Sequence, residues 1–254
     1  MSAKGITIAL SGKGGVGKTF ISSMLIKRLA EHGSVLAIDA DPDSNLPQAL
    51  GVSVKRSVGQ SREDIINAPM RSPVTNSKQE HLEQAIHESI EEFPKFDIIV
   101  MGRSEGEGCY CAVNHVIRGV IDTRARGYDF TIIDCHAGLE HLSRRTTRDV
   151  DIMLVVVEPT KNSVQTAKRV MEIAKELHIQ FGAVFVVANR VTPENRPRVD
   201  ELAKENGLEI TAYVPFEPLV NEYDGMGKPV SDLPKDSPAS RAIDEICQKI
   251  LSYA

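Results

Sequence analysis

At 254 residues with 41% hydrophobic content, the chain is long enough to bury a large core, and we expect one α/β domain over residues 1–254. The net charge of −5 predicts no broad surface for nucleic acid or for an anionic membrane. The N-terminus enters a strand within a few residues, and no apolar run is near the ~20 residues that span a bilayer. Together with four cysteines, these features predict a cytoplasmic protein with reduced thiols.

A glycine-rich turn lies between the first apolar run and the first helical pattern. Residues 6–10 are mostly apolar, and residues 12–19 read GKGGVGKT. In such a strand–turn–helix, backbone N–H groups point at phosphate oxygens and the helix dipole adds positive field. Lys18 would reach the β- and γ-phosphates, and the Thr19 hydroxyl would sit on Mg²⁺. The residues predicted to bind a nucleoside triphosphate here are Gly12, Lys13, Gly14, Gly15, Val16, Gly17, Lys18, Thr19 and Phe20.

Short β-branched runs alternate with helical patterns along the rest of the chain. Several runs are apolar throughout, as expected for strands covered on both faces. This alternation predicts a doubly wound, mostly parallel α/β sheet with helices on both faces and ligand loops at the C-terminal ends of the strands. Together with the glycine-rich turn, it predicts a single P-loop NTPase domain. The predicted strands after the first are residues 34–39, 97–101, 130–134, 152–157, 183–188 and 210–214, and residues 163–177 are a predicted helix.

Two segments need separate interpretation. Residues 52–95 are polar and contain prolines, and they favour a helix only over about residues 78–92. The last helix has one apolar face, which includes Cys247. A membrane-targeting tip and packing on the sheet would both use such a face. Acidic residues such as Asp244 beside Lys249 favour packing on the sheet, because a membrane tip needs a basic array.

Lys13 makes the glycine-rich turn more specific than an ordinary P-loop. With this second lysine, the turn resembles the deviant Walker A sequence of the MinD/ParA and nitrogenase iron protein group of dimeric ATPases. In that group the early lysine crosses to the nucleotide of the partner subunit. The resemblance implies that Lys13 and Lys18 both act in catalysis and that ATP binding closes a homodimer. The alternative is a solvated lysine in a loop.

The acidic turn of residues 39–43 closes the second predicted strand. In the resembled ATPases, the aspartate before the proline orients the attacking water, which implies this role for Asp41. Asp39 and Asp43 could assist through water bound to Mg²⁺. The residues alone also allow an acidic turn that caps a helix starting at Ser44.

The strand at residues 130–134 ends in Asp134, which can hold magnesium through water as a Walker B carboxylate. A buried strand can end in aspartate for other reasons, so the upstream P-loop carries this prediction. The predicted magnesium residues are Thr19, Asp41 and Asp134. Ala137 and Gly138 follow as a turn that a γ-phosphate could order.

Two late segments resemble the adenine pocket of the same group. Asn189 and Arg190 stand where the group has Asn-Lys, and the amide of Asn189 can donate to and accept from a base edge. Pro215 and Phe216 match the position that lines the base. The resemblance therefore implies ATP and ADP as ligands, and a plain strand-end asparagine is the alternative.

Cys109 and Cys111 lie in a glycine-rich segment after the predicted strand at 97–101. Two thiols one residue apart can face one ion, but tetrahedral S₄ coordination needs two more sulfurs. A two-fold dimer would supply them by placing the same loop of each chain across its axis. We predict a shared site for Ni²⁺, with Zn²⁺ as the other ion that thiolates suit. Two unrelated loop cysteines are the alternative.

At this point the chain as a whole resembles the CooC-type accessory ATPases that insert nickel into carbon monoxide dehydrogenase. The shared motifs are Asp-x-Asp-Pro-Asp-Ser at 39–44, Cys-Tyr-Cys at 109–111, Ala-Gly-x-Glu-His-Leu at 137–142 and Glu-Pro-x-x-x-Ser at 158–163. The resemblance implies an ATP-dependent, dimerising metallochaperone. Its client would be apo carbon monoxide dehydrogenase or an acetyl-CoA synthase component, with no nucleic-acid or membrane partner.

Two other functions stay open. A spatial partitioning ATPase of the MinD/ParA type would need a basic patch or a basic terminal helix. An iron–sulfur carrier or electron-transfer ATPase would bridge a cluster between subunits. The nitrogenase iron protein has a ligating cysteine that matches Cys109, but the position of its second ligand holds His141 here, which argues against a cluster held in the same manner. Cys135 and His136 fit either a transient metal relay or packing beneath the following loop.

Overall fold

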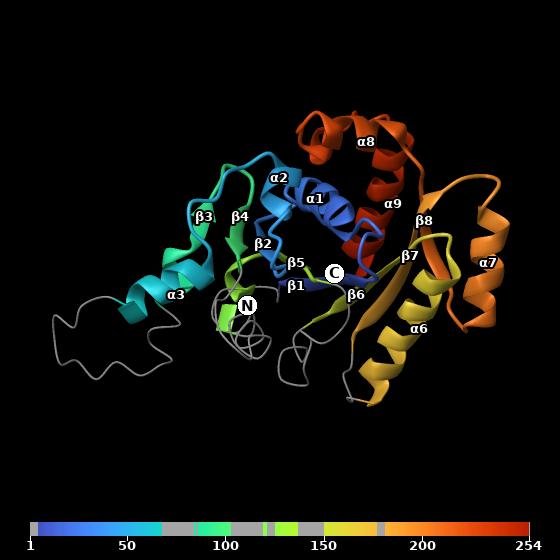
Figure 1. Ribbon diagram of the computed structural model, residues 1–254, viewed down its shortest axis with the longest axis horizontal. Coiled ribbons are helices and arrows are strands. Elements are labelled where there is room, and N and C mark those ends of the chain that lie inside the picture. Colours follow the sequence, from blue (N-terminus) through green and yellow to red (C-terminus); the bar gives the residue numbers. More distant parts are fainter. Residues whose placement is uncertain are drawn as a thin grey trace.

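The structure is a computed structural model that describes residues 5–67, 84, 86–102, 119–120, 125–136, 150–176 and 181–253. Its strands form one eight-stranded sheet in the order β3-β4-β2-β5-β1-β6-β7-β8 (Figure 1). All neighbouring strands are parallel except β3 and β4. The strands are β1 (Ile6–Gly12), β2 (Val35–Asp39), β3 (Ile90–Glu92), β4 (Asp97–Val100), β5 (Phe130–Asp134), β6 (Ile152–Val157), β7 (Ala183–Val191) and β8 (Ile210–Pro215). The predicted doubly wound α/β architecture is confirmed.

Helices cover both faces of this sheet, which explains the continuous apolar runs. Successive side chains of a strand point to opposite faces. In β6, Leu154 and Val156 pack into the cluster that contains α1 and α9, whereas Met153 and Val155 pack into the cluster that contains α6. Figure 1 shows α1, α2, α8 and α9 on one side of the sheet and α6 and α7 on the other. The helices are α1 (Lys18–Leu29), α2 (Leu46–Leu50), α3 (Val58–Asn67), α6 (Lys161–Glu176), α7 (Arg196–Glu205), α8 (Pro218–Gly225) and α9 (Pro238–Tyr253), with 3₁₀ turns η1 (Ala125–Gly127) and η2 (Val230–Asp232).

Most predicted strands agree with the structure to within one residue, whereas β1 ends two residues later than the predicted run of 6–10 and β7 departs most. The sequence predicts an end at residue 188, but β7 continues to Val191 because Val191 pairs with Pro215 of β8 beyond a register shift. Asn189 and Arg190 therefore lie inside the last part of a strand. This long-range pairing leaves no signal in local periodicity.

The segment over residues 52–95 differs from the prediction. Glu88 is still helical, but Ile90–Glu92 form the short edge strand β3, so the helix predicted to continue to residue 92 is wrong at its end. β3 runs antiparallel to β4, with Ile90 opposite Ile99. Sheet pairing thus overrides the local helical pattern. The segment also contains α3, which the sequence analysis does not predict.

The last helix packs on the sheet, as predicted. Ile243, Ile246 and Ile250 of α9 are at most 1% exposed, and Cys247 is buried beside them. These side chains join the cluster of α1 and β8, so the apolar face of α9 is used inside the fold. Within the residues that the structure describes, none of the helices has both the length and the apolar character that crossing a bilayer requires.

Candidate functional site

The glycine-rich loop joins the end of β1 to the start of α1, at the centre of the sheet. Gly12, Gly15 and Gly17 have φ values of 145°, 81° and 91°, which side chains disfavour. The loop is also closely packed, because a Cβ on Gly17 would lie 2.3 Å from Nδ2 of Asn189, and a Cβ on Gly12 would lie 2.3 Å from the Val156 carbonyl oxygen. The glycines therefore permit both the backbone shape and the close approach of β6 and β7.

Lys18 lies in the first turn of α1 and is 7% exposed. Its Nζ donates to the carbonyl oxygens of Gly12 at 3.4 Å and Lys13 at 3.2 Å, so its ammonium already lies along the loop. Burial lowers the pKa of Lys18, and the nearby charge of Asp134 opposes that shift. A phosphate bound in the loop would add negative charge beside the ammonium and stabilise its charged form.

Two buried carboxylates lie side by side at the ends of β2 and β5. Asp39 is directly opposite Asp134 in the parallel register, and the two are 0% and 1% exposed. Burial, strengthened by the charge of Asp134, raises the pKa of Asp39 to about 8. Burial also raises the pKa of Asp134 to about 6, although hydrogen bonds from the Thr19 and Ser22 hydroxyls lower this pKa. At neutral pH the two carboxyl groups together favour retaining a proton.

Asp134 has the properties of a magnesium carboxylate. Its Oδ1 accepts a hydrogen bond from Oγ of Ser22 at 3.1 Å. Its Oδ2 is buried and has no hydrogen-bond partner within the described part of the chain. Since Thr19 of α1 faces the same carboxyl group, a hydroxyl and a free carboxylate oxygen lie where a hard cation needs oxygen ligands or bound water. Thr19 and Asp134 therefore fit Mg²⁺.

Asp39 organises the acidic turn, which is a role the sequence did not indicate. Its Oδ1 accepts from the Asp41 amide at 3.1 Å, and its Oδ2 accepts from the Leu46 amide at 3.0 Å. The alternative of an acidic turn that caps a helix is therefore borne out through Asp39, but the helix does not start at Ser44. Helix α2 begins at Leu46, and the carboxylate that binds its first amide comes from the strand end seven positions earlier.

Asp41 is half-buried, and its Oδ1 accepts from the Asp43 amide at 3.0 Å. Its charge acts on both Lys18 and Asp134, so Asp41 lies near these two residues. The structure therefore brings together Lys18, Thr19, Asp41 and Asp134, the four predicted residues that concern the phosphates and magnesium. The chemistry assigned to Asp41 stays a prediction.

Lys13 lies at the open side of the loop, with 43% of its side chain exposed. Its Nζ is 3.9 Å from Oε1 of Glu158, which directly follows β6, and Nη1 of Arg190 is 3.5 Å from Oε2 of the same carboxylate. Glu158 thus holds the predicted crossing lysine within its own subunit. In the sequence Glu158 stands out only as part of a motif, although an acidic residue immediately after a buried strand is itself a signal for this edge of the sheet.

The predicted base-binding residues lie around one cavity of about 40 Å³, together with Gly17 and Phe20. Phe216 is 47% exposed at its mouth. Asn189 is buried, and its Nδ2 donates to the Val16 carbonyl at 2.8 Å while its Oδ1 accepts from the Arg190 amide at 2.9 Å. The Asn189 amide therefore fixes the glycine-rich loop to β7. Base recognition by Asn189, Arg190, Pro215 and Phe216 stays a prediction.

The residues predicted to bind nickel, Cys109 and Cys111, lie outside the described residues, as do Glu140 and His141. Cys135 is described and is buried, and burial raises the pKa of its thiol to about 12. Cys135 belongs to the apolar cluster that contains Ile38 and Ile133, which supports packing over a metal relay. In the described ranges no cluster of three or more histidine, cysteine or acidic side chains is arranged to hold a metal ion.

Comparison with known proteins places this geometry in context. The family profile of the CobQ/CobB/MinD/ParA nucleotide-binding domain (CbiA) matches residues 7–230. An uncharacterised ATP-binding protein of Methanocaldococcus jannaschii is 45% identical over 248 residues, with 96% of this chain and 98% of the relative covered. The carbon monoxide dehydrogenase accessory protein CooC of Rhodospirillum rubrum is 29% identical over 247 residues, with 92% of this chain and 91% of CooC covered.

Solved structures show the same fold at lower sequence identity. A ParA family ATPase from Chlorobium tepidum superposes with a TM-score of 0.74 at 19% identity, covering 96% of this chain and 98% of that chain. The MinD cell division protein of Aquifex aeolicus superposes with a TM-score of 0.70 at 22% identity, covering 97% of each chain. These similarities support the arrangement of sheet and loops described above.

The raised pKa of Asp39 predicts a pH-dependent stability in the absence of magnesium and nucleotide. Between its ordinary value of 3.8 and about 8, the folded state binds more protons at Asp39 than the unfolded state. The free energy of unfolding should therefore fall as pH rises through this window. Asp39→Asn removes this titration. Between pH 5 and pH 8, its free energy of unfolding should therefore rise by more than about 1 kcal/mol relative to that of wild type. Urea denaturation in EDTA measures this, with the exposed Asp236→Asn as the control, and parallel pH profiles for wild type and Asp39→Asn would contradict it.

Proposed function

Since this chain belongs to the CobQ/CobB/MinD/ParA family of nucleotide-binding proteins, we propose that it is a Mg²⁺-dependent ATPase that acts as a dimerising metallochaperone. The observation that carries the metal-delivery part is the combination of a Cys-x-Cys pair, Cys109 and Cys111, with similarity to CooC along 92% of the chain. The cargo would be nickel, with Zn²⁺ as a competing ion, and the client would be apo carbon monoxide dehydrogenase or a related acetyl-CoA synthase component.

ATP hydrolysis needs positioning and charge stabilisation more than covalent chemistry. Lys18 contacts the phosphates as they gain charge, and the loop amides hold them at the start of α1. Asp41 orients a water toward the γ-phosphorus; the new bond forms from the water oxygen, the bond to the β-phosphate oxygen breaks, and ADP leaves. Thr19 and Asp134 would hold Mg²⁺, which would supply positive charge that stabilises the phosphates during hydrolysis.

Dimerisation would change the partner of Lys13. In the single chain its ammonium lies near Glu158, in a half-exposed pair that is weak enough to break. The phosphates of a nucleotide bound by a second subunit offer it a stronger partner, and Arg190 remains to neutralise Glu158. ATP would then favour the closed dimer because it binds that state more tightly than the open one.

Topology supports a link between the nucleotide and the thiols. β4 is the parallel neighbour of β2, so the segment that follows β4 leaves the same edge of the sheet as the acidic turn that follows β2. Cys109 and Cys111 belong to that segment, nine and eleven residues after Val100 in the sequence. If the four thiolates of two subunits bind one ion only in the closed dimer, metal and ATP must each strengthen the binding of the other.

The rival functions have less support. A partitioning ATPase with a membrane tip would need the apolar face of α9, which is buried in the fold. An iron–sulfur carrier would use the same cysteines as the proposed nickel metallochaperone. These two functions differ in the iron content and the visible absorption of the protein. Anaerobic purification followed by iron analysis separates them.

Asp41→Asn should retain ATP binding but slow hydrolysis by about 10²-fold, because the attacking water loses its orienting carboxylate. Phosphate release under saturating Mg²⁺–ATP measures the rate, and fluorescence titration measures the affinity. The exposed Asp236→Asn, outside the acidic turn, is the control. Unchanged turnover in Asp41→Asn would remove this assignment.

Substitutions at Lys13 and Glu158 should have opposite effects on ATP-induced dimerisation. Lys13→Gln removes the crossing charge and should weaken association. Glu158→Gln releases Lys13 from its own subunit and should strengthen association by up to about fivefold, the limit set by a half-exposed pair. Sedimentation with a non-hydrolysable ATP analogue measures both. Identical association of the three proteins would contradict the crossing lysine.

The double variant Cys109→Ser, Cys111→Ser should lose the metal of the dimer while keeping wild-type ATP affinity. We expect one Ni²⁺ per ATP-loaded wild-type dimer, and metal analysis after size fractionation measures this ratio. Each single variant serves as an intermediate, because it leaves two sulfurs per dimer. Unchanged metal in the double variant would contradict the shared site.

A further inference from the structure

A second pocket lies at the end of α1 that is remote from the glycine-rich loop. It has a volume of about 620 Å³, which is within the usual range for small-molecule sites. Its walls come from the last turns of α1, the end of α2, the β3–β4 connection and the segment around η2. Since α1 has 12 residues, the pocket lies roughly 18 Å from the phosphate loop.

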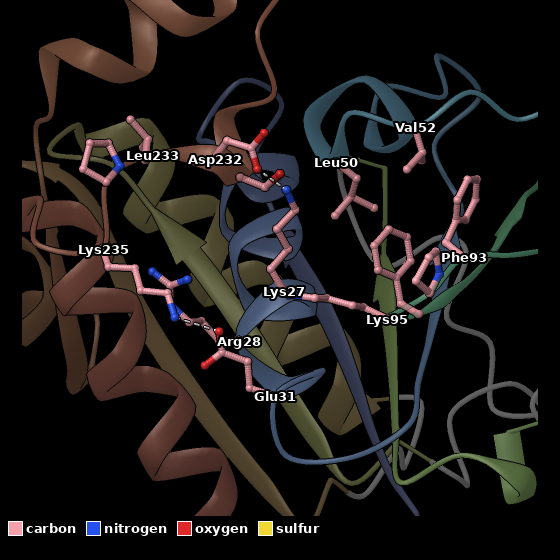
Figure 2. Close-up of a pocket in the computed structure, with 14 residues that line it drawn as sticks. Lys27, Arg28, Glu31, Leu50, Val52, Phe93, Lys95, Asp232, Leu233 and Lys235 are labelled. Atoms are coloured by element: carbon pink, nitrogen blue, oxygen red, sulfur yellow. Dashed lines mark hydrogen bonds and ion pairs between the residues drawn. The ribbon is translucent and has the colours of Figure 1, made fainter.

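Apolar and charged side chains both line this pocket. Figure 2 shows Leu50, Val52 and Phe93 on one side and Arg28 and Lys235 on the other. The ring of Phe96 lies against that of Phe93, with centroids 5.7 Å apart, and extends the apolar side. A ligand that fills the pocket would therefore need both an apolar body and a polar group.

Two buried donors in the pocket wall lack partners. Nε of Arg28 donates to Asp244 at 2.5 Å, but its Nη2 makes no hydrogen bond to any described residue. The hydroxyl of Ser231, which is 3% exposed, also makes none. Among the described residues, only one other buried side-chain atom, Oδ2 of Asp134, is in this condition. Because unpaired buried polar atoms are rare and costly, two at one pocket indicate a ligand with acceptor oxygens.

The net positive charge of the side chains that line the pocket also favours an anionic ligand. Four cationic and two acidic side chains line it: Lys27, Arg28, Lys95 and Lys235 against Glu31 and Asp232. The acidic pair is already engaged, Asp232 by Lys27 and Glu31 by Lys235 at 2.9 Å. The hydrogen bond from Lys235 lowers the pKa of Glu31, and Arg28 and Lys95 add to the same effect. Lys95 forms no ion pair with a described residue, so positive charge is left over.

We propose that this pocket binds a small organic anion, a carboxylate attached to an aromatic or branched aliphatic body. The body lies on Leu50, Val52 and Phe93, and the carboxylate accepts hydrogen bonds from Arg28 and Ser231. Both donors are buried, so the carboxylate reaches them only when a side chain at the rim of the pocket moves. Lys235 is such a residue, because its side chain is 74% exposed and its pair with Glu31 is a weak surface pair. The site is independent of the proposed metal delivery.

The test compares 3-phenylpropionate with its neutral amide, 3-phenylpropanamide, on the full chain by NMR titration. The carboxylate should bind at least about tenfold more tightly than the amide, because only the anion forms charge-assisted hydrogen bonds. Saturating Mg²⁺–ADP should leave its affinity unchanged, since the nucleotide site is at the other end of α1. Equal affinities for the two probes, loss of binding with ADP, or no binding of the carboxylate up to about 10 mM would each overturn the proposal.

Three variants locate the anion. Arg28→Lys keeps a charge for Asp244 but removes Nη2. Ser231→Ala removes a hydroxyl that makes no hydrogen bond to a described residue, so it should not lower stability. Each variant should weaken the binding of 3-phenylpropionate by about threefold or more and leave the binding of 3-phenylpropanamide unchanged. Phe93→Ala should weaken the binding of both probes, because both place their apolar body on Phe93. Arg169→Lys, an exposed arginine on α6, is the matched control. Wild-type affinity for the carboxylate in both Arg28→Lys and Ser231→Ala would overturn the assignment.

Discussion

Burial of two adjacent carboxylates is the interaction on which the nucleotide site depends. Asp39 and Asp134 meet at neighbouring strand ends because β2 and β5 are paired in parallel register. Asp134 is tied to α1 through Ser22, and Asp39 is tied to the acidic turn and to α2 through the Asp41 and Leu46 amides. Any change in charge at this pair, whether by a proton or a cation, therefore acts on the loops that surround the phosphates.

A second set of contacts fixes the other side of the glycine-rich loop. Asn189 binds the Val16 carbonyl, and Glu158 lies near both Lys13 and Arg190. The ends of β6 and β7 thus hold the loop from one side, while the carboxylates at the ends of β2 and β5 face it from the other. A phosphate-binding loop supported in this way needs little rearrangement to accept its ligand, which reduces the cost of binding.

Helix α1 connects this site with the second pocket. Its first turn carries Lys18 and Thr19, and its last turn carries Lys27 and Arg28. Helix α2 also connects the nucleotide site with the second pocket. Its first amide binds Asp39, and its last residue, Leu50, lines the pocket. Both helices are short and well packed, so each presents one end to the nucleotide and the other to a separate cavity.

The sequence by itself determined the parallel α/β sheet, the glycine-rich loop and the identities of Lys18, Thr19 and Asp134, because strand periodicity and a loop motif are local in the chain. Only the tertiary structure decided what joins them. The pairing of Asp39 with Asp134, the contact of Glu158 with Lys13 and the hold of Asn189 on Val16 all connect residues far apart in the sequence. The edge strand β3 and the unpaired donors of Arg28 and Ser231 were likewise invisible, since strand pairing and burial depend on what the rest of the chain packs against them.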